Sequence, residues 1–147
     1  MKKLFLLFLF LSLPVIIHAQ SFFVPSDVQI SLDRITNAFR AGNPKAMDDL
    51  LSSPVTMRLQ DSLYRDISNI QASDLLQSFF SDKKVIDFRF STPGNGKLIY
   101  EEAGKRDTVN VDIWMRRALG GPVLHEINIS NYPIATVFFN IHHDDKK

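Results

Sequence analysis

Apolar residues recur at helical spacing in the first half of the chain, and they change to a spacing of two in the second half. The first helix is expected to begin at Ser26, where Gln29 three residues later completes a capping box, and to stop at Gly42 in the left-handed conformation. Its apolar face consists of Val28, Leu32, Ile35 and Phe39. This spacing predicts one amphipathic helix that packs on a core.

Two further helices are predicted before the strands take over. A short one starts at Asn43, with Pro44 in the first helical position. The next starts at Ser68, where Gln71 repeats the capping-box pattern. The apolar face of this third helix consists of Ala72, Leu75, Leu76 and Phe79.

Strands are predicted wherever apolar and polar residues alternate. Residues 55–59 alternate, Asp61 and Ser62 form a turn, and residues 63–67 return beside the first strand. Four more strands are expected within residues 86–90, 98–103, 109–115 and 123–129, and the Asn95-Gly96 pair suits a tight hairpin. Helices that precede a meander of strands indicate an α+β fold, in which N-terminal helices pack on a curved antiparallel sheet. The expected core includes Phe39, Leu76, Phe79, Val111 and Ile113.

The first nineteen residues have the pattern of a secretion signal. Lys2 and Lys3 precede an apolar run that ends near Ala19, and this run is shorter than the roughly 20 residues of a membrane span. Cleavage after Ala19 is therefore expected, with export to the periplasm or beyond and no membrane attachment afterwards. The predicted organisation is a signal peptide at 1–19, a linker at 20–26, one domain at 27–131 and a C-terminal segment at 132–147.

Composition restricts the partners of the exported domain. Loss of Lys2 and Lys3 changes the formal net charge of +1 to −1, which argues against nucleic-acid binding. There is no cysteine, so burial alone must stabilise the domain. His142, His143, Asp144 and Asp145 are adjacent in a polar tail and do not readily converge on one ion, so no metal and no cofactor is expected.

The apolar run at residues 132–141 carries no charge and is rich in strand formers. We expect residues 137–141 either to cover hydrophobic surface on their own domain or to meet the same segment of a second copy.

Residues 35–47 (ITNAFRAGNPKAM), 55–57 (VTM) and 75–80 (LLQSFF), followed by the glycine-turned strands, carry a resemblance to known proteins. The chain resembles the nuclear-transport-factor-two-like cone fold, also described as cystatin-like, which is found in ketosteroid isomerase and scytalone dehydratase. It is more similar to a family of small exported Gram-negative bacterial proteins of unknown function. The resemblance covers about residues 27–130 and implies a conical pocket between helices and sheet.

Candidate chemistry in such a pocket is sparse. His125 shares the alternation of Ile127 and Ile129, which would direct it toward the pocket, and an imidazole there would act as acid or base. Tyr64 and Asp66 are two residues apart on a predicted strand, so they are expected on the same face, and they are weaker candidates. Asp87, Arg89 and Asp112 alternate with the apolar residues of their strands, so they are expected on the opposite face and are not candidates for the pocket.

Three functional hypotheses remain open from the sequence. The first is a non-catalytic exported domain that binds a small apolar ligand or a protein partner. The second is a cavity enzyme of isomerase or hydrolase type that uses His125 or Asp66. The third is a structural module that forms a homodimer.

Overall fold

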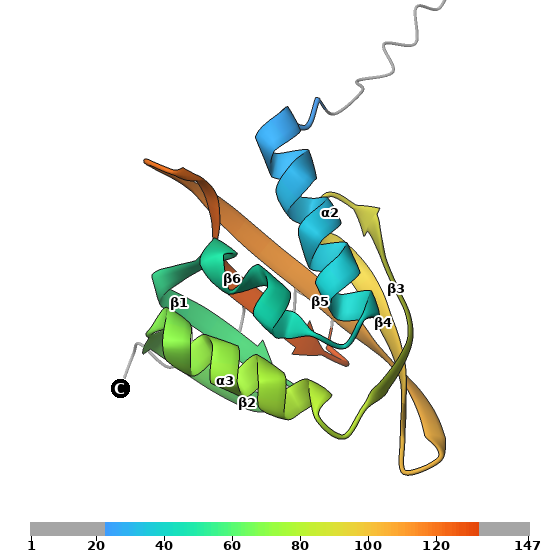
Figure 1. Ribbon diagram of the computed structural model, residues 1–147. Coiled ribbons are helices and arrows are strands. Elements are labelled where there is room, and N and C mark those ends of the chain that lie inside the picture. Colours follow the sequence, from blue (N-terminus) through green and yellow to red (C-terminus); the bar gives the residue numbers. More distant parts are fainter. Residues whose placement is uncertain (1–22, 133–147) are drawn as a thin grey trace, which may run out of the picture.

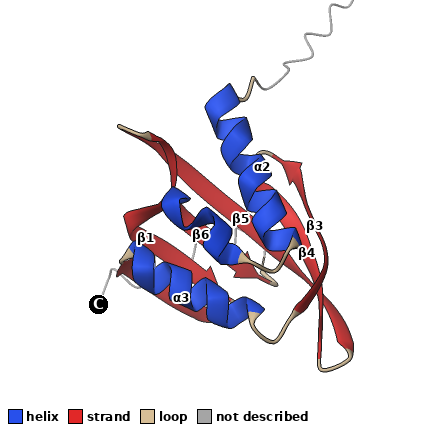
Figure 2. Cartoon of the chain, viewed as in Figure 1, coloured by secondary structure: helices blue, strands red, loops and turns tan. Residues whose placement is uncertain are grey.

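The computed structural model describes residues 23–132, which form a layer of helices on a curved layer of strands (Figures 1 and 2). The helical elements are α2 (Ser26–Arg40), η1 (Pro44–Leu50) and α3 (Asn69–Phe80). The strands are β1 (Leu51–Leu59), β2 (Ser62–Ile67), β3 (Lys84–Thr92), β4 (Asn95–Glu102), β5 (Lys105–Ala118) and β6 (Gly121–Ser130). The α+β fold predicted from the sequence, with helices packed on a curved sheet, is confirmed.

The six strands form one sheet in the order β2-β1-β6-β5-β4-β3. Every neighbouring pair is antiparallel except β1 and β6, which are parallel, so the sheet is mixed rather than wholly antiparallel as expected. Parallel strands need a long connection, and β1 and β6 are joined by most of the domain. No hairpin therefore forces these two strands to run in opposite directions. Strand β3 lies at one edge of the sheet and β6 lies inside it.

The three helical elements lie on the same face of the sheet (Figure 1). Gly42 follows α2 with a φ of 60°, which confirms the left-handed stop, and η1 is a 3-10 helix that begins at Pro44. The predicted capping box at Ser26 is wrong, because Pro25 occupies the N-cap and no side chain caps the helix there. None of the helices within residues 23–132 is long and apolar enough to cross a membrane.

The core between helices and sheet is closed by aromatic rings. The ring centroid of Phe39 lies 5.2 Å from that of Phe80 and 5.0 Å from that of Phe88. Phe39, Leu76, Val111 and Ile113 are buried as predicted. Phe79 is only half-buried, because α3 turns Ala72, Leu76 and Phe80 inward at intervals of four residues and leaves Phe79 at the side of this stripe. The space between α2, α3 and β3 is thus filled by side chains.

The hairpin between β3 and β4 turns at a different pair of residues from the one predicted. Thr92 and Asn95 are the last cross-strand pair, so Pro93 and Gly94 form the turn, with a φ of 87° at Gly94. Gly96 belongs to β4, where a Cβ atom would lie 2.6 Å from the main-chain oxygen of Arg89. The second glycine of the Asn-Gly pair therefore permits a close approach of two strands and does not make the turn.

Candidate functional site

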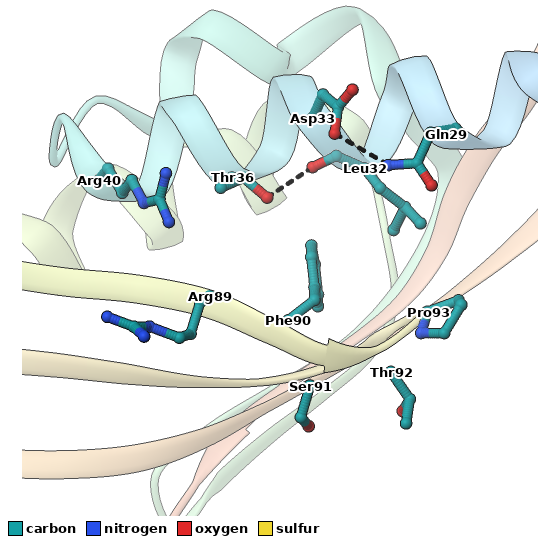
Figure 3. Close-up of a pocket in the computed structure, with 10 residues that line it drawn as sticks. All are labelled: Gln29, Leu32, Asp33, Thr36, Arg40, Arg89, Phe90, Ser91, Thr92 and Pro93. Atoms are coloured by element: carbon teal, nitrogen blue, oxygen red, sulfur yellow. Dashed lines mark hydrogen bonds between the residues drawn. The ribbon is translucent and has the colours of Figure 1, made fainter.

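An open groove of about 340 Å³ runs between α2 and the edge strand β3 (Figure 3). We call it the α2–β3 groove. Its helical wall is formed by Gln29, Leu32, Asp33, Thr36 and Arg40. Its other wall is formed by residues 89–93, which comprise Arg89, Phe90, Ser91, Thr92 and Pro93. Two segments far apart in the sequence therefore enclose a single hollow.

The helical wall follows from the spacing of its residues, because positions three and four apart fall on one face of a helix. Leu32 points down toward β3, and Phe90 points up from β3 toward the helix (Figure 3). Polar groups surround this apolar floor. Nε2 of Gln29 donates to the Asp33 carboxylate at 2.9 Å, and the Thr36 hydroxyl donates to the main-chain oxygen of Leu32 at 2.8 Å.

Arg40 forms one end of the groove and contacts the edge of the sheet. Its Nε atom donates to the main-chain oxygen of Phe88 at 2.8 Å and lies 3.7 Å from the Asp87 carboxylate. Asp87 also accepts from Arg89, and these two guanidinium groups hold the pKa of Asp87 below its usual value, Arg89 contributing most. This end of the groove therefore carries two exposed cations against one partly shielded carboxylate.

A smaller apolar hollow of about 140 Å³ adjoins the other end of the groove. It shares Leu32 and Pro93 with the groove. Its remaining lining residues are Val28, Gly94, Ile113 and Met115. The two hollows together offer an apolar recess at one end and cations at the other.

A third hollow of about 190 Å³ lies between η1 and α3 and is lined by Lys45, Asp48, Asn69, Ile70, Ser73 and Asp74. The Ser73 hydroxyl donates to the Asp48 carboxylate at 2.7 Å. This bond joins the two helical elements across the hollow. Ser73 and Asp48 are thus already engaged in holding η1 against α3.

The candidate residues chosen from the sequence do not line any of these three hollows. Asp66 is exposed on the edge strand β2 with a φ of 53°, and Tyr64 packs half-buried against the core. His125 is half-buried on β6, which is separated from β2 by β1. The structure therefore does not bring His125 together with Tyr64 or Asp66 as neighbours in the sheet.

The predicted phase of His125 is wrong because β6 contains a register shift. Trp114 pairs with Glu126 and Met115 pairs with Leu124, so His125 is the extra residue of a bulge. Leu124, Ile127 and Ile129 are fully buried on the core side. Because of the bulge, His125 does not alternate in register with these residues. The inward direction of its imidazole, for which it was chosen as a candidate catalytic residue, is therefore not supported.

A buried tyrosine was missed by the sequence argument. Tyr100 lies on β4 in phase with Leu98, is 2 % exposed, and receives a hydrogen bond on its hydroxyl from Nε2 of Gln60 at 3.3 Å. Burial, with a smaller contribution from Asp107, raises the pKa of Tyr100. Nζ of Lys83 lies 5.6 Å from its ring centroid and 4.7 Å from that of Phe79. The alternation with Leu98 was the signal that could have found Tyr100.

Metal binding receives no support from the side chains between residues 23 and 132, where no three His, Cys, Asp or Glu residues are grouped so as to hold an ion. The adjacent His142, His143, Asp144 and Asp145 lie outside the described residues.

Residues 32–130 match the family described as "Domain of unknown function (DUF4783)". The chain belongs to this family. The resemblance to a bacterial family of unknown function is thereby confirmed. The matched segment contains β1 to β6, η1, α3 and most of α2, and so includes both walls of the α2–β3 groove except Gln29. No curated protein matches the chain.

Solved structures of two DUF4783 proteins are similar to this chain. The protein from Bacteroides uniformis is 21% identical, with a TM-score of 0.55 over 69% of this chain and 96% of that one. The protein from Bacteroides fragilis is 19% identical, with a TM-score of 0.56 over 75% of this chain and 100% of that one. A protein of the NTF2-like family from Streptomyces avermitilis is 13% identical, with a TM-score of 0.48 over 73% and 94% of the two chains. At these identities the DUF4783 structures support the fold alone.

Proposed function

We propose that this DUF4783 protein is exported and serves as a non-catalytic binding domain, which takes a short extended segment of a protein partner into the α2–β3 groove. The observation that carries this proposal is the position of β3, an edge strand whose outer backbone borders the groove. Edge strands present main-chain groups that pair readily with another extended chain.

The direction of the main-chain groups on β3 follows from the bond made by Arg40. The Phe88 oxygen accepts from this arginine on α2, so it points away from β4. Residues 87–90 pair with β4 in a regular register. Because alternate residues of an antiparallel strand direct their main-chain groups to the same side, Phe90 also directs its N–H and C=O outward, into the groove. A bound segment would find one donor and one acceptor there.

The side chains of the groove indicate which segment would fit. Leu32 and Phe90 form an apolar floor, and the adjoining hollow at Ile113 and Met115 offers room for one apolar side chain. Arg40 and Arg89 stand at the opposite end and favour an acidic residue or a main-chain oxygen. We therefore expect a segment with one apolar anchor followed or preceded by an acidic group.

The filled core favours a protein segment over an enclosed apolar ligand. Phe39, Phe80 and Phe88 occupy the place between helices and sheet where a conical pocket was expected. The apolar hollow of about 140 Å³ is smaller than the roughly 300–1,000 Å³ of ordinary ligand pockets. The α2–β3 groove reaches this size, at about 340 Å³, but it is open and most of its lining residues are polar. The enzymatic alternative gains no support, since His125, Tyr64 and Asp66 line none of the three hollows.

Site-specific photo-crosslinking in the producing cells tests the binding proposal. Benzoylphenylalanine is placed at Asp33, which lines the groove, and in a matched protein at Asn37, an exposed residue of the same helix outside the lining. We expect an adduct of protein mass from position 33 and none from position 37. Equal adducts from both positions, or none from position 33, would contradict the proposal, and an adduct of lipid mass would favour the small-ligand hypothesis.

Export is tested separately on the same protein. The segment with Lys2 and Lys3 at its start should be removed, so that terminal sequencing of the protein from the periplasm or medium begins at Gln20 or its cyclised form. Recovery of chains that still begin at Met1, held in the membrane fraction, would contradict cleavage without bearing on the groove.

A further inference from the structure

We propose that residues 134–141, which lie outside the described residues, pack across the face of the sheet opposite α2, η1 and α3, over a row formed by Arg58, Asn128 and Asp112. We call this surface the helix-free face. The proposal is independent of the α2–β3 groove, which lies on the other side of the sheet.

The row lies side by side on three neighbouring strands. Asn128 on β6 pairs with Asp112 on β5 and with Arg58 on β1. The residues beside them in the sequence, among them Ile127 and Met57, are buried in the core, so the row lies on the opposite face. Within residues 23–132 no helix is seen over that face (Figure 1). Asn128 is nevertheless 2 % exposed and Asp112 is 5 % exposed.

Two atoms of this row are buried without a partner among residues 23–132. Nδ2 of Asn128 donates to Asp112 at 3.1 Å, but Oδ1 of Asn128 and Nε of Arg58 have no hydrogen bond to any of the described residues. One of these atoms is an acceptor and the other is a donor, and leaving either unpaired costs free energy. A polypeptide backbone carries both an N–H and a C=O group, so one extended segment of main chain can satisfy both atoms.

The chain leaves β6 on this same face. Ser130 alternates with Ile129, shares its face with Asn128, and is fully buried. Its hydroxyl donates to the main-chain oxygen of Tyr132 at 3.2 Å, which draws the end of the described chain onto the helix-free face. Strand β6 already has neighbours on both sides, β1 and β5, so the residues that follow cannot add to it in the plane of the sheet.

The length and chemistry of the following residues suit this surface. Eight residues in an extended conformation reach about 26 Å. From β6 the sheet extends two strands to the β2 edge and three to the β3 edge, which at a spacing of about 4.8 Å is about 10 Å and about 14 Å, so the segment is long enough to cross the row and reach either edge. Residues 134–141 (IATVFFNI) contain no charge, while Asp144, Asp145, Lys146 and Lys147 come after them. Half-buried apolar side chains lie beside the polar row at Leu63, which pairs with Arg58, and at Trp114, two residues from Asp112. They offer contacts to Val137, Phe138 or Phe139.

The same segment of a second copy could also cover this face, but the chain's own segment is favoured because it is covalently connected to the row. Residue 134 follows Asn128 of the row by only six residues, and a segment on so short a tether has an effective concentration in the millimolar range, far above that of a second molecule in solution. The connection from Tyr132 is short enough that no large loop has to be closed.

The only tryptophan of the chain, Trp114, alternates with Ile113 and so reports on the helix-free face. Two double variants of the mature chain are compared. The first carries Val137→Asp and Phe139→Asp within the segment, and the control carries His142→Asp and His143→Asp, which place the same charges just beyond it. We expect acrylamide to quench the Trp114 fluorescence several-fold more strongly in the first variant and unchanged in the second. Equal quenching in both would overturn the proposal, as would a dimer whose Trp114 becomes accessible on dilution.

A second measurement covers the case in which the charged variant fails to fold. The chain has no cysteine, so Ala135→Cys gives one attachment point for a nitroxide spin label. We expect the label to broaden the amide resonances of Asn110, Asp112 and Asn128 and to leave those of Asp33 and Asn37 on α2 sharp. Broadening on α2, or broadening that vanishes when labelled protein is diluted with unlabelled protein, would refute packing of the segment on its own sheet.

Discussion

The side-chain amide of Asn128 donates to the carboxylate of Asp112 at 3.1 Å, across the pair of strands β5 and β6. Both residues are almost fully buried, and burial raises the pKa of Asp112, while the bond from Asn128 acts in the opposite direction. Within residues 23–132, the fold thus removes a carboxylate from water with one neutral donor, Asn128, to replace its hydration. This has a consequence for stability as the pH changes.

Asp112→Asn should raise the free energy of unfolding at neutral pH, because ionisation of the buried Asp112 carboxyl group destabilises the native chain as the pH rises. The folded-state pKa of Asp112 lies above the unfolded value of about 3.9, so its contribution to the free energy of unfolding is full below that value and is lost as the pH rises through the folded-state pKa. Asparagine has no proton to lose and keeps an oxygen that accepts from Asn128. Urea unfolding should therefore show the variant more stable than the native chain at pH 7 and equal to it at pH 3.

Asp74→Asn is the control, because Asp74 is exposed on α3. It should change stability little at either pH. A variant Asp112→Asn that is less stable than the native chain at pH 7 would mean that the charge of Asp112 is compensated by a group not among its described partners.

The two Ser-x-x-Gln motifs give a matched pair of helix starts. Ser68 accepts from the amide of Gln71 at 3.2 Å, and the Gln71 side chain accepts from the amide of Ser68 at 3.0 Å, whereas Ser26 caps nothing. Ser68→Ala should lower the free energy of unfolding by about 1 kcal/mol, the usual value of a lost cap. Ser26→Ala should change it by less than about 0.5 kcal/mol. Equal losses in urea unfolding would show that α2 depends on its first turn as α3 does.

The order of the elements, the alternation in β5 and the closing glycine of α2 were predictable because each is fixed by residues close together in the sequence. The capping box at Ser68 was predictable for the same reason. At Ser26 the same motif failed, because Pro25 with its ψ of 143° occupies the cap position and the main-chain oxygen of Pro25 accepts the first helical bond from Gln29. The Ser-x-x-Gln motif alone does not show that the residue before the serine occupies the N-cap position instead.

The features that failed depend on contacts between distant strands. The bulge at His125 arises where β6 pairs with β5, and the sequence of β6 alone reads as unbroken alternation. The α2–β3 groove joins residues about 60 positions apart, and only the packing of α2 beside the sheet edge brings them together. The candidate site was therefore out of reach of a search for local motifs.

The adjacent phenylalanines at the end of α3 test which helical face is buried. Phe80 is 3 % exposed and packs on the ring of Phe39, while Phe79 is half-buried at the side. Phe80→Ala should cost about 3–5 kcal/mol, as for other buried aromatics. Phe79→Ala should cost less, because part of its surface is in water already. Should chemical unfolding give the larger loss for Phe79, the sequence-based assignment of the face would be restored and that of the structure refuted.

The last prediction compares alanine variants of Gly96 and Gly120. The comparison distinguishes the effect of close strand packing from the effect of reduced backbone flexibility in a turn. At Gly96 a Cβ atom would lie 2.6 Å from the Arg89 oxygen and 3.1 Å from Cδ1 of Phe90, whereas at Gly120 it would meet nothing within 4 Å. Gly96→Ala has to push β3 away from β4, so it should lower the free energy of unfolding by about 1–3 kcal/mol, the usual cost of overpacking. Gly120→Ala should stay within about 0.5 kcal/mol of the native chain. Hydrogen exchange of the β3 and β4 amides locates the effect, since they should exchange faster in the first variant alone. If Gly96→Ala left both stability and exchange unchanged, the two strands would not be held as closely as their register requires, and the edge that borders the groove would not be a fixed surface.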